Sequence, residues 1–172
     1  MQNNNFYYAL CDQIMNGSVN MSKIKAINGD SPDRAPNSYY PFYACGGQLL
    51  PSGGTSGDGY VYGGLLIGSG STPATVNDYK LENQIKTGFS AIAAISNNNN
   101  SIASAGQLLT TTTITNTSSS DLVINEVGYA RKYADGSIGW TVLLDRIVLD
   151  TPVTIAPNET RTFEYRIKMP QP

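Results

Sequence analysis

The chain has 172 residues, a formal net charge of −2 and only 14% charged residues, a length that suits one domain with a single buried core. Its 11 Lys and Arg residues are scattered and outnumbered by 13 Asp and Glu residues, so no basic patch is available for a nucleic-acid backbone. The absence of His and the presence of only two Cys argue against a Ser-His-Asp triad, a zinc site or a disulfide framework, and we expect neither a metal nor a cofactor.

The start of the chain, MQNNNFYYAL, lacks the basic region of a secretory signal. No apolar run approaches the roughly 20 residues that span a bilayer. We therefore expect a soluble protein made in the cytoplasm, with no membrane partner and with free, buried thiols at Cys11 and Cys45. Triplets of the glycosylation type are attributed to chance in so Asn-rich and Ser-rich a chain; they begin at Asn16, Asn20, Asn116 and Asn158.

The first predicted element is a helix over residues 6–15. Phe6, Leu10 and Ile14 recur at a spacing of four, and Tyr7 lies beside them on the same face. A helix of this length is marginal in water and must pack on another surface. That surface is either its own domain or a neighbouring subunit, so these four residues are interface candidates.

Residues 29–59 predict a long irregular segment punctuated by Pro and Gly. Loops of this length are uncommon inside compact domains unless they bind something or are held by a partner. The aromatic residues Tyr39, Tyr40, Phe42 and Tyr43 are therefore further interface candidates, with coverage of a core edge as the alternative. We expect residues 1–59 to form an attachment arm and residues 60–172 to form the folded domain.

The rest of the chain predicts short strands separated by Gly, Pro and Asn turns. Residues 162–167 alternate polar and apolar side chains with period two, which indicates one buried face. Spacings of about 8 to 12 residues favour an all-β fold, an antiparallel β-sandwich of the immunoglobulin-like or jelly-roll-like type. The expected strands are 60–67, 88–95, 107–115, 121–131, 138–149, 151–155 and 160–167.

The sequence Gly68-Ser69-Gly70 after an apolar run raises the question of a phosphate-binding loop. Such a loop needs backbone N–H groups at a helix N-terminus, and a Walker loop also needs a Gly-Lys pair. Here Pro73 interrupts the donors and no Gly-Lys pair follows. We interpret the glycines as the exit of a buried strand into a turn, after which a helix-like piece begins near Asn77 and Leu81 anchors the segment to the domain.

Without His, a hydrolase would have to use carboxylates alone. Asp145 and Arg146 lie mid-strand in VLLDRIVL, where neighbours point to opposite faces. Either a bulge exposes both, or one points inward and must be paired, and we favour a structural salt link or subunit contact over catalysis. The candidate carboxylate pairs are Asp30 with Asp33, Asp78 with Glu82, and Asp145 with Asp150.

Three stretches of the chain combine strand and turn phrases: IGSGSTPATVNDYKLENQI at 67–85, TTITNTSSSDLVINEVGYA at 112–130 and LLDRIVLDTPVTIAPNETRTFEYRI at 143–167. They resemble phrases that recur in structural proteins of tailed bacteriophages. The resemblance covers about residues 60–169 and consists of turn and strand phrases rather than catalytic signatures. Asn158 stands where Gly is common in this family, and we expect it to adopt a left-handed conformation that Asn tolerates.

The resemblance implies a role in the virion rather than a reaction. We expect a non-enzymatic homo-oligomer, assembled in the bacterial host cytoplasm, that attaches to other virion proteins of a tail, baseplate, fibre or head-neck decoration. The alternative is a carbohydrate-binding or receptor-binding module on the virion surface. Its sugar-stacking candidates are Tyr39, Tyr40, Tyr43, Tyr60 and Tyr62.

Overall fold

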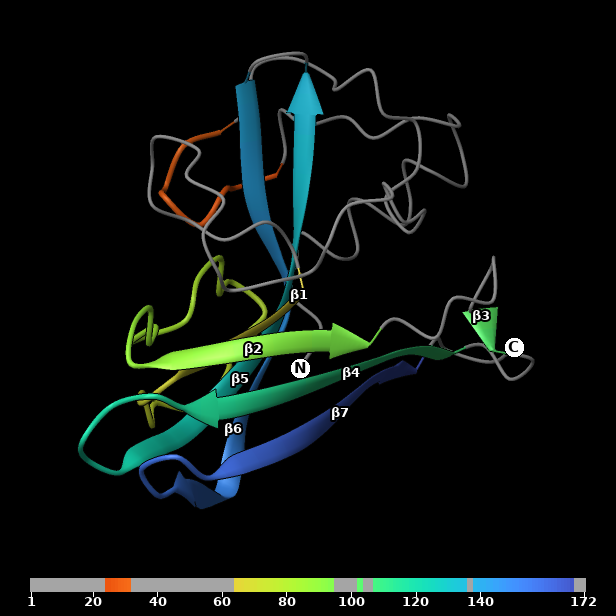
Figure 1. Cartoon of the computed structure of the whole chain (residues 1–172). Coiled ribbons are helices and arrows are strands. Elements are labelled where there is room, and N and C mark those ends of the chain that lie inside the picture. Colours follow the sequence, from red (N-terminus) through yellow and green to blue (C-terminus); the bar gives the residue numbers. More distant parts are fainter. Residues whose placement is uncertain (1–23, 32–63, 95–101, 104–106, 136–137, 169–172) are drawn as a thin grey trace.

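The structure, a computed structural model, describes residues 24–31, 64–94, 102–103, 107–135 and 138–168. In these ranges it contains strands and no helix (Figure 1). The helix predicted over residues 6–15 and the Tyr-rich segment at 39–43 lie outside the described residues. The strands are β1 Gly64–Gly68, β2 Phe89–Ala94, β3 Ile102–Ala103, β4 Gln107–Asn116, β5 Leu122–Asp135, β6 Ile138–Ile155 and β7 Thr160–Lys168.

The strands form two antiparallel sheets. Sheet A has the order β1-β5-β6. In sheet B, β4 pairs with β7 along one edge and with β2 and then β3 along the other. The prediction of an all-β, antiparallel fold is confirmed for the described residues.

One predicted boundary is wrong. Residues 138–149 and 151–155 were expected to be separate strands, but β6 runs through both. Val148 pairs with Glu126 and Val153 pairs with Ile124, so residues 149–152 bulge opposite Asn125 alone. The bulge accommodates Pro152, which has no N–H for a regular ladder.

The main core contains side chains from both sheets. Sheet B contributes Ala91 from β2, Ile114 from β4 and Tyr165 from β7. Phe163, two residues before Tyr165, also packs against this core, as the period-two pattern of β7 predicted. The buried members are Ile24, Leu65, Ile67, Ala91, Ile114, Leu122, Ile124, Val127, Tyr129, Val142, Leu144, Ile155 and Tyr165. Ile24 belongs to the segment 24–31, so this part of the predicted arm packs against the strands.

The irregularity at Asn125 also shifts the phase of β5. Before it, Leu122 and Ile124 face the main core, and after it Val127 and Tyr129 do. A bulge restores burial because it changes which parity of residue points inward. All four of these apolar residues are therefore buried.

A second, smaller cluster lies on the other face of sheet A. It takes Leu66 from β1, whereas the neighbours Leu65 and Ile67 face the main core. Gly128 of β5 leaves space for the side chains of this cluster, because a Cβ at position 128 would lie 2.7 Å from Leu143 Cδ1. The members are Ile27, Leu66, Leu81, Ala130 and Leu143.

Asn116 ties two turns together at the end of β4. Its buried side chain donates from Nδ2 to the carbonyl oxygens of Ser120 and Ile155, at 2.8 Å each. Its backbone also bonds to the turn that precedes β7, through Glu159 O and Asn158 N. Asn158 has φ of 63°, so its predicted left-handed conformation is confirmed.

Candidate functional site

Residues 69–86, here called the clamp loop, cover the outer face of sheet A. The loop leaves β1 and returns along its edge, where Ser69 N donates to Asn83 O and Ile85 N donates to Ile67 O, both at 2.9 Å. Leu81 is buried in the smaller cluster, and Ile85 packs against the main core. The prediction that Leu81 anchors the segment is confirmed.

Glu126, Arg146, Asp78 and Glu82 hold this loop and are here called the clamp. At its centre lies the carboxylate of Glu126, a residue of β5 with no exposed surface. It accepts hydrogen bonds from three backbone N–H groups of the loop, those of Gly70 at 3.1 Å, Glu82 at 3.1 Å and Asn83 at 2.8 Å. Three amide donors compensate much of the cost of burying a negative charge. The loop is therefore folded around a side chain of the sheet.

The two glycines make this close approach possible. A Cβ on Gly68 would lie 2.4 Å from Glu126 Oε1, and a Cβ on Gly70 would lie 2.6 Å from the same atom. Any larger residue would push the loop off the carboxylate. The Gly-Ser-Gly sequence does cradle an anion, but that anion is the chain's own Glu126.

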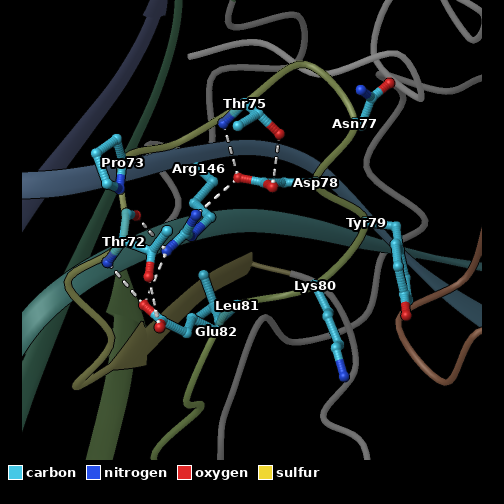
Figure 2. Close-up of a pocket in the computed structure, with 10 residues that line it drawn as sticks. All are labelled: Thr72, Pro73, Thr75, Asn77, Asp78, Tyr79, Lys80, Leu81, Glu82 and Arg146. Atoms are coloured by element: carbon cyan, nitrogen blue, oxygen red, sulfur yellow. Dashed lines mark hydrogen bonds and ion pairs between the residues drawn. The ribbon is translucent and has the colours of Figure 1, made fainter.

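Arg146 of β6 completes the clamp from the sheet side of the loop. Its Nε donates to Glu126 Oε2 at 2.8 Å, and its Nη1 donates to Asp78 Oδ2 at 2.7 Å. Its Nη2 donates to Thr72 O at 3.0 Å and lies 3.6 Å from Glu82 Oε2. Figure 2 shows the guanidinium between these loop groups, and its planar fork suits several acceptors at once.

Asp78 and Glu82 also fix the loop backbone. Asp78 accepts from Thr75 N and Oγ1, both at 2.9 Å. Glu82 accepts from Thr72 N at 2.8 Å and from Thr72 Oγ1 at 2.6 Å. Asp78 closes a turn rather than beginning a helix, so the prediction of a helix-like piece near Asn77 is wrong.

These contacts shift the pKa values in the directions expected for a structural ion cluster. Burial alone would raise the pKa of Asp78, but hydrogen bonds from Thr75 and Arg146 outweigh it and lower the pKa. Hydrogen bonds from the Thr72 side chain and backbone lower the pKa of Glu82. Burial would lower the pKa of Arg146, but its bonds to Asp78 and Glu126 raise it. Asp78, Glu82 and Arg146 are therefore charged at neutral pH.

A hollow of about 290 Å³ opens beside the clamp, with Arg146 in its wall. Figure 2 shows Tyr79 and Lys80 directed away from the guanidinium, and Lys25 Nζ lies 4.0 Å from the centre of the Tyr79 ring. No group of three or more His, Cys, Asp or Glu suited to a metal occurs in the described part of the chain. With their oxygens occupied by loop donors, the carboxylates act as anchors of the backbone.

Asp145 and Arg146 point to opposite faces of sheet A, and both are buried. Tyr129 pairs with Asp145 while Ala130 pairs with Leu143, so Leu144 is an extra residue in β6. This bulge turns Asp145 into the main core, where Tyr165 of sheet B donates to Oδ2 at 2.7 Å. The alternative that a bulge exposes both residues is wrong, and the predicted salt link is confirmed for Arg146.

Tyr165 joins the two sheets through this hydrogen bond. Its ring also stacks near that of Tyr129, with centroids 6.2 Å apart and an interplanar angle of 22°. Burial raises the pKa of Tyr165 well above its ordinary value, and the Asp145 charge adds to the shift. The phenol therefore stays protonated and can donate across the core.

Two of the three carboxylate pairs suggested by the sequence have both members in the described residues, and of these two the structure brings Asp78 and Glu82 together, around Arg146. Asp145 lies in the core, whereas Asp150 is exposed. Asp30 is exposed and accepts from Asn28 Nδ2 at 2.8 Å, and Asp33 lies outside the described residues. Sequence reasoning missed Glu126, whose signal was a lone acidic residue inside the apolar strand 122–130.

The interface candidates predicted from the sequence lie outside the described residues, and so do the sugar-stacking candidates Tyr60 and Tyr62. They stay predictions. The interface set is Phe6, Tyr7, Leu10, Ile14, Tyr39, Tyr40, Phe42 and Tyr43.

Comparison with known protein families, curated proteins and solved structures gives no match to this chain. No helix in the described residues is long and apolar enough to cross a membrane.

Proposed function

We propose that this chain is a non-enzymatic structural component of a tailed-bacteriophage virion, built on an antiparallel β-sandwich that attaches to neighbouring virion subunits. The described strands supply the two sheets, and a common core lies between them. Immunoglobulin-like and jelly-roll-like variants of the sandwich both agree with this arrangement.

The proposal rests on the position of the three stretches that resemble phage structural proteins, because they contact one another in the fold. Glycines and acidic residues of the first stretch, Glu126 of the second and Arg146 of the third converge in one clamp. Segments of the sequence that resemble phage structural proteins are thus the ones that hold the loop on sheet A. A motif that builds a rigid scaffold suits a structural protein, and it explains why the resemblance contains no catalytic signature.

The proposed mechanism is attachment through buried area and strand-edge pairing. Residues 1–59, with their aromatic interface candidates, are the proposed attachment arm. The two-sheet domain then acts as a rigid body whose loops keep one geometry. Head and tail positions are both compatible with this role.

The alternative function is binding of a host glycan or receptor at the virion surface. One observation favours it, the hydroxyl-rich outer face of sheet B. There Thr113 and Thr162 lie with their Oγ1 atoms 3.0 Å apart, and Thr115 and Thr160 with theirs 2.8 Å apart. A glycan array with the purified chain tests this alternative, and binding that resists replacement of Thr113 and Thr162 by Val would exclude this face.

The proposal is tested with particles that lack the protein. We expect a phage from which the gene of this chain is deleted to give defective particles. The wild-type chain supplied in trans should enter these particles in a fixed copy number. A clamp variant such as Glu126→Ala should enter poorly, whereas the surface variant Asp121→Asn should enter normally. Normal particles without the chain, or a chain that never joins a particle, would contradict the proposal.

A further inference from the structure

Strand β7 forms one edge of sheet B, with β4 as its neighbour (Figure 1). Its pairing with β4 runs from Thr160 to Lys168 without a register shift, unlike the pairing of β5 with β6. No other described strand pairs with β7. It contains no Pro and no bulge, which are common devices that keep an edge strand from pairing with another chain.

The backbone groups of alternate residues in β7 point away from β4. Asn116 N donates to Glu159 O at the start of the ladder, and bonded pairs then recur at every second residue of an antiparallel ladder. Residues 161, 163 and 165 therefore bond to β4. Thr162, Glu164 and Arg166 direct their N–H and C=O groups to the open edge.

The side chains of these three residues are also exposed. Glu164 and Arg166 each retain 48% of their side-chain exposure, and Arg166 Nη2 donates to Glu164 Oε2 at 2.7 Å. Charged side chains on an edge strand usually oppose pairing with another chain. Opposite charges two residues apart are different, because they are complementary to their own copy in one antiparallel register.

We propose that β7 pairs with β7 of a second copy of this chain, antiparallel and about a two-fold axis at Tyr165. In this register Glu164 of each copy lies opposite Arg166 of the other, and Thr162 lies opposite Lys168. The pairing uses the outward backbone groups, and the four charges form a square in which each has two opposite neighbours. Sheet B becomes continuous across the dimer.

The charge pattern selects this register over its neighbours. An axis at Glu164 or at Arg166 places like charges opposite each other, which is unfavourable in a sheet. An axis at Phe163 places Glu164 opposite Thr162 and gains no ion pair. A two-fold axis makes the contact isologous and closed, so the dimer does not grow into a fibre.

The experiment measures the mass of the purified full-length chain by light scattering and sedimentation over a concentration series. We expect a dimer. Each of Glu164→Arg and Arg166→Glu replaces two attractive cross-strand pairs with two repulsive ones, so the dimer Kd should rise by roughly tenfold or more. The double exchange E164R/R166E restores the complementary pattern and should restore the Kd.

The matched control is Arg161→Glu on the same strand. Arg161 is exposed and makes the same change of charge, but in the proposed register it lies opposite residue 169, beyond the end of β7. Its dimer Kd should therefore stay near the wild-type value. Circular dichroism checks that each variant is folded.

A backbone variant tests the proposed strand pairing independently of the charges. Thr162→Pro removes an N–H directed at the partner while leaving the bonds to β4, and it should give a folded monomer. A wild-type chain that stays monomeric, or a dimer unaffected by either single reversal, would overturn the proposal. The inference goes beyond the virion role, because dimerisation of the pure chain and incorporation into particles are separate measurements.

Discussion

Arg146 on β6 and Glu126 on β5 form an ion pair, 2.8 Å from Nε to Oε2, whose side chains are 4% and 0% exposed. The pair joins neighbouring strands and holds the clamp loop above them. Removing one partner of a buried ion pair leaves an uncompensated charge, which costs about 3–5 kcal/mol in other proteins. The stability of the domain is therefore expected to depend on this contact.

The first prediction concerns Glu126→Gln. The amide replaces an acceptor oxygen with an NH₂ group that faces other donors, and Arg146 loses its buried counter-charge. We expect the free energy of unfolding to fall by about 3 kcal/mol or more. Asp121→Asn, at an exposed site, should change it by less than about 1 kcal/mol. Equal effects of the two substitutions in denaturant titrations would refute the buried clamp.

The second prediction concerns Gly70→Ala. A Cβ at this position would lie 2.5 Å from Glu82 Cβ and 2.6 Å from Glu126 Oε1. The loop must move, so we expect a loss of about 1–3 kcal/mol in unfolding free energy. Ser71→Ala, one residue further along and exposed, is the control and should be nearly neutral. A Gly70→Ala variant as stable as the wild type would show that the loop does not approach Glu126 so closely.

The third prediction concerns Tyr165→Phe, which removes the hydroxyl that donates to Asp145 Oδ2 at 2.7 Å. The buried carboxylate then lacks this donor, and we expect a loss of about 1–3 kcal/mol in unfolding free energy at neutral pH. An unchanged unfolding free energy in calorimetry or denaturant titration would argue against a bond between the sheets.

The same variant has a pH signature. The pKa of Tyr165 is raised in the folded chain above its ordinary value of 10.0, so the folded state holds this proton more tightly than the unfolded state. The stabilisation is fully present below pH 10 and is lost as pH rises above it. Between pH 9 and 11 the wild type should lose more stability than Tyr165→Phe. Parallel pH profiles of the two chains would contradict the assignment.

The fourth prediction concerns acid. The pKa values of Asp78 and Glu82 are lowered from their ordinary values of 3.8 and 4.5, so both groups stabilise the fold above those values and lose this effect as pH falls below them. We expect the amide NMR signal of Gly70, which reports the bond to Glu126, to shift in this range before global unfolding. Asp78→Asn should weaken the acid dependence, and Asp121→Asn should not. Simultaneous loss of all amide signals would contradict early release of the loop.

The fifth prediction concerns Asn158, which has φ of 63°. Asn158→Gly should leave the unfolding free energy unchanged or raise it slightly, because Gly adopts this conformation without strain. Asn158→Val should lower it by about 1–2 kcal/mol, because a β-branched residue is strained there. Equal thermal stability of the Gly and Val variants would contradict the left-handed turn.

The strands could be predicted because their signals are local. Alternation in β7 and the apolar run of β1 depend on neighbouring residues, and Pro157 with Asn158 marks the turn before β7. Bulges are harder to predict, since they depend on pairing with another strand. The extra residue Leu144 decides where Asp145 points, and the sequence alone left that choice open.

The clamp could be predicted only in part. The anchoring of Leu81 and the pairing of Arg146 follow from apolar spacing and from the cost of a buried charge. Glu126 could not be assigned its role, because its donors are backbone amides 43 to 56 residues away in the sequence. The need for Gly68 and Gly70 likewise follows from their close approach to Glu126, which is present only in the folded chain.

We propose that this chain is a built-in part of a virion. The most direct test is quantitative mass spectrometry of gradient-purified particles of the phage that is proposed to encode it. The proposed virion role predicts a fixed copy number per particle that stays constant through repeated purification. Particles that are intact and infectious yet contain none of the chain would contradict it.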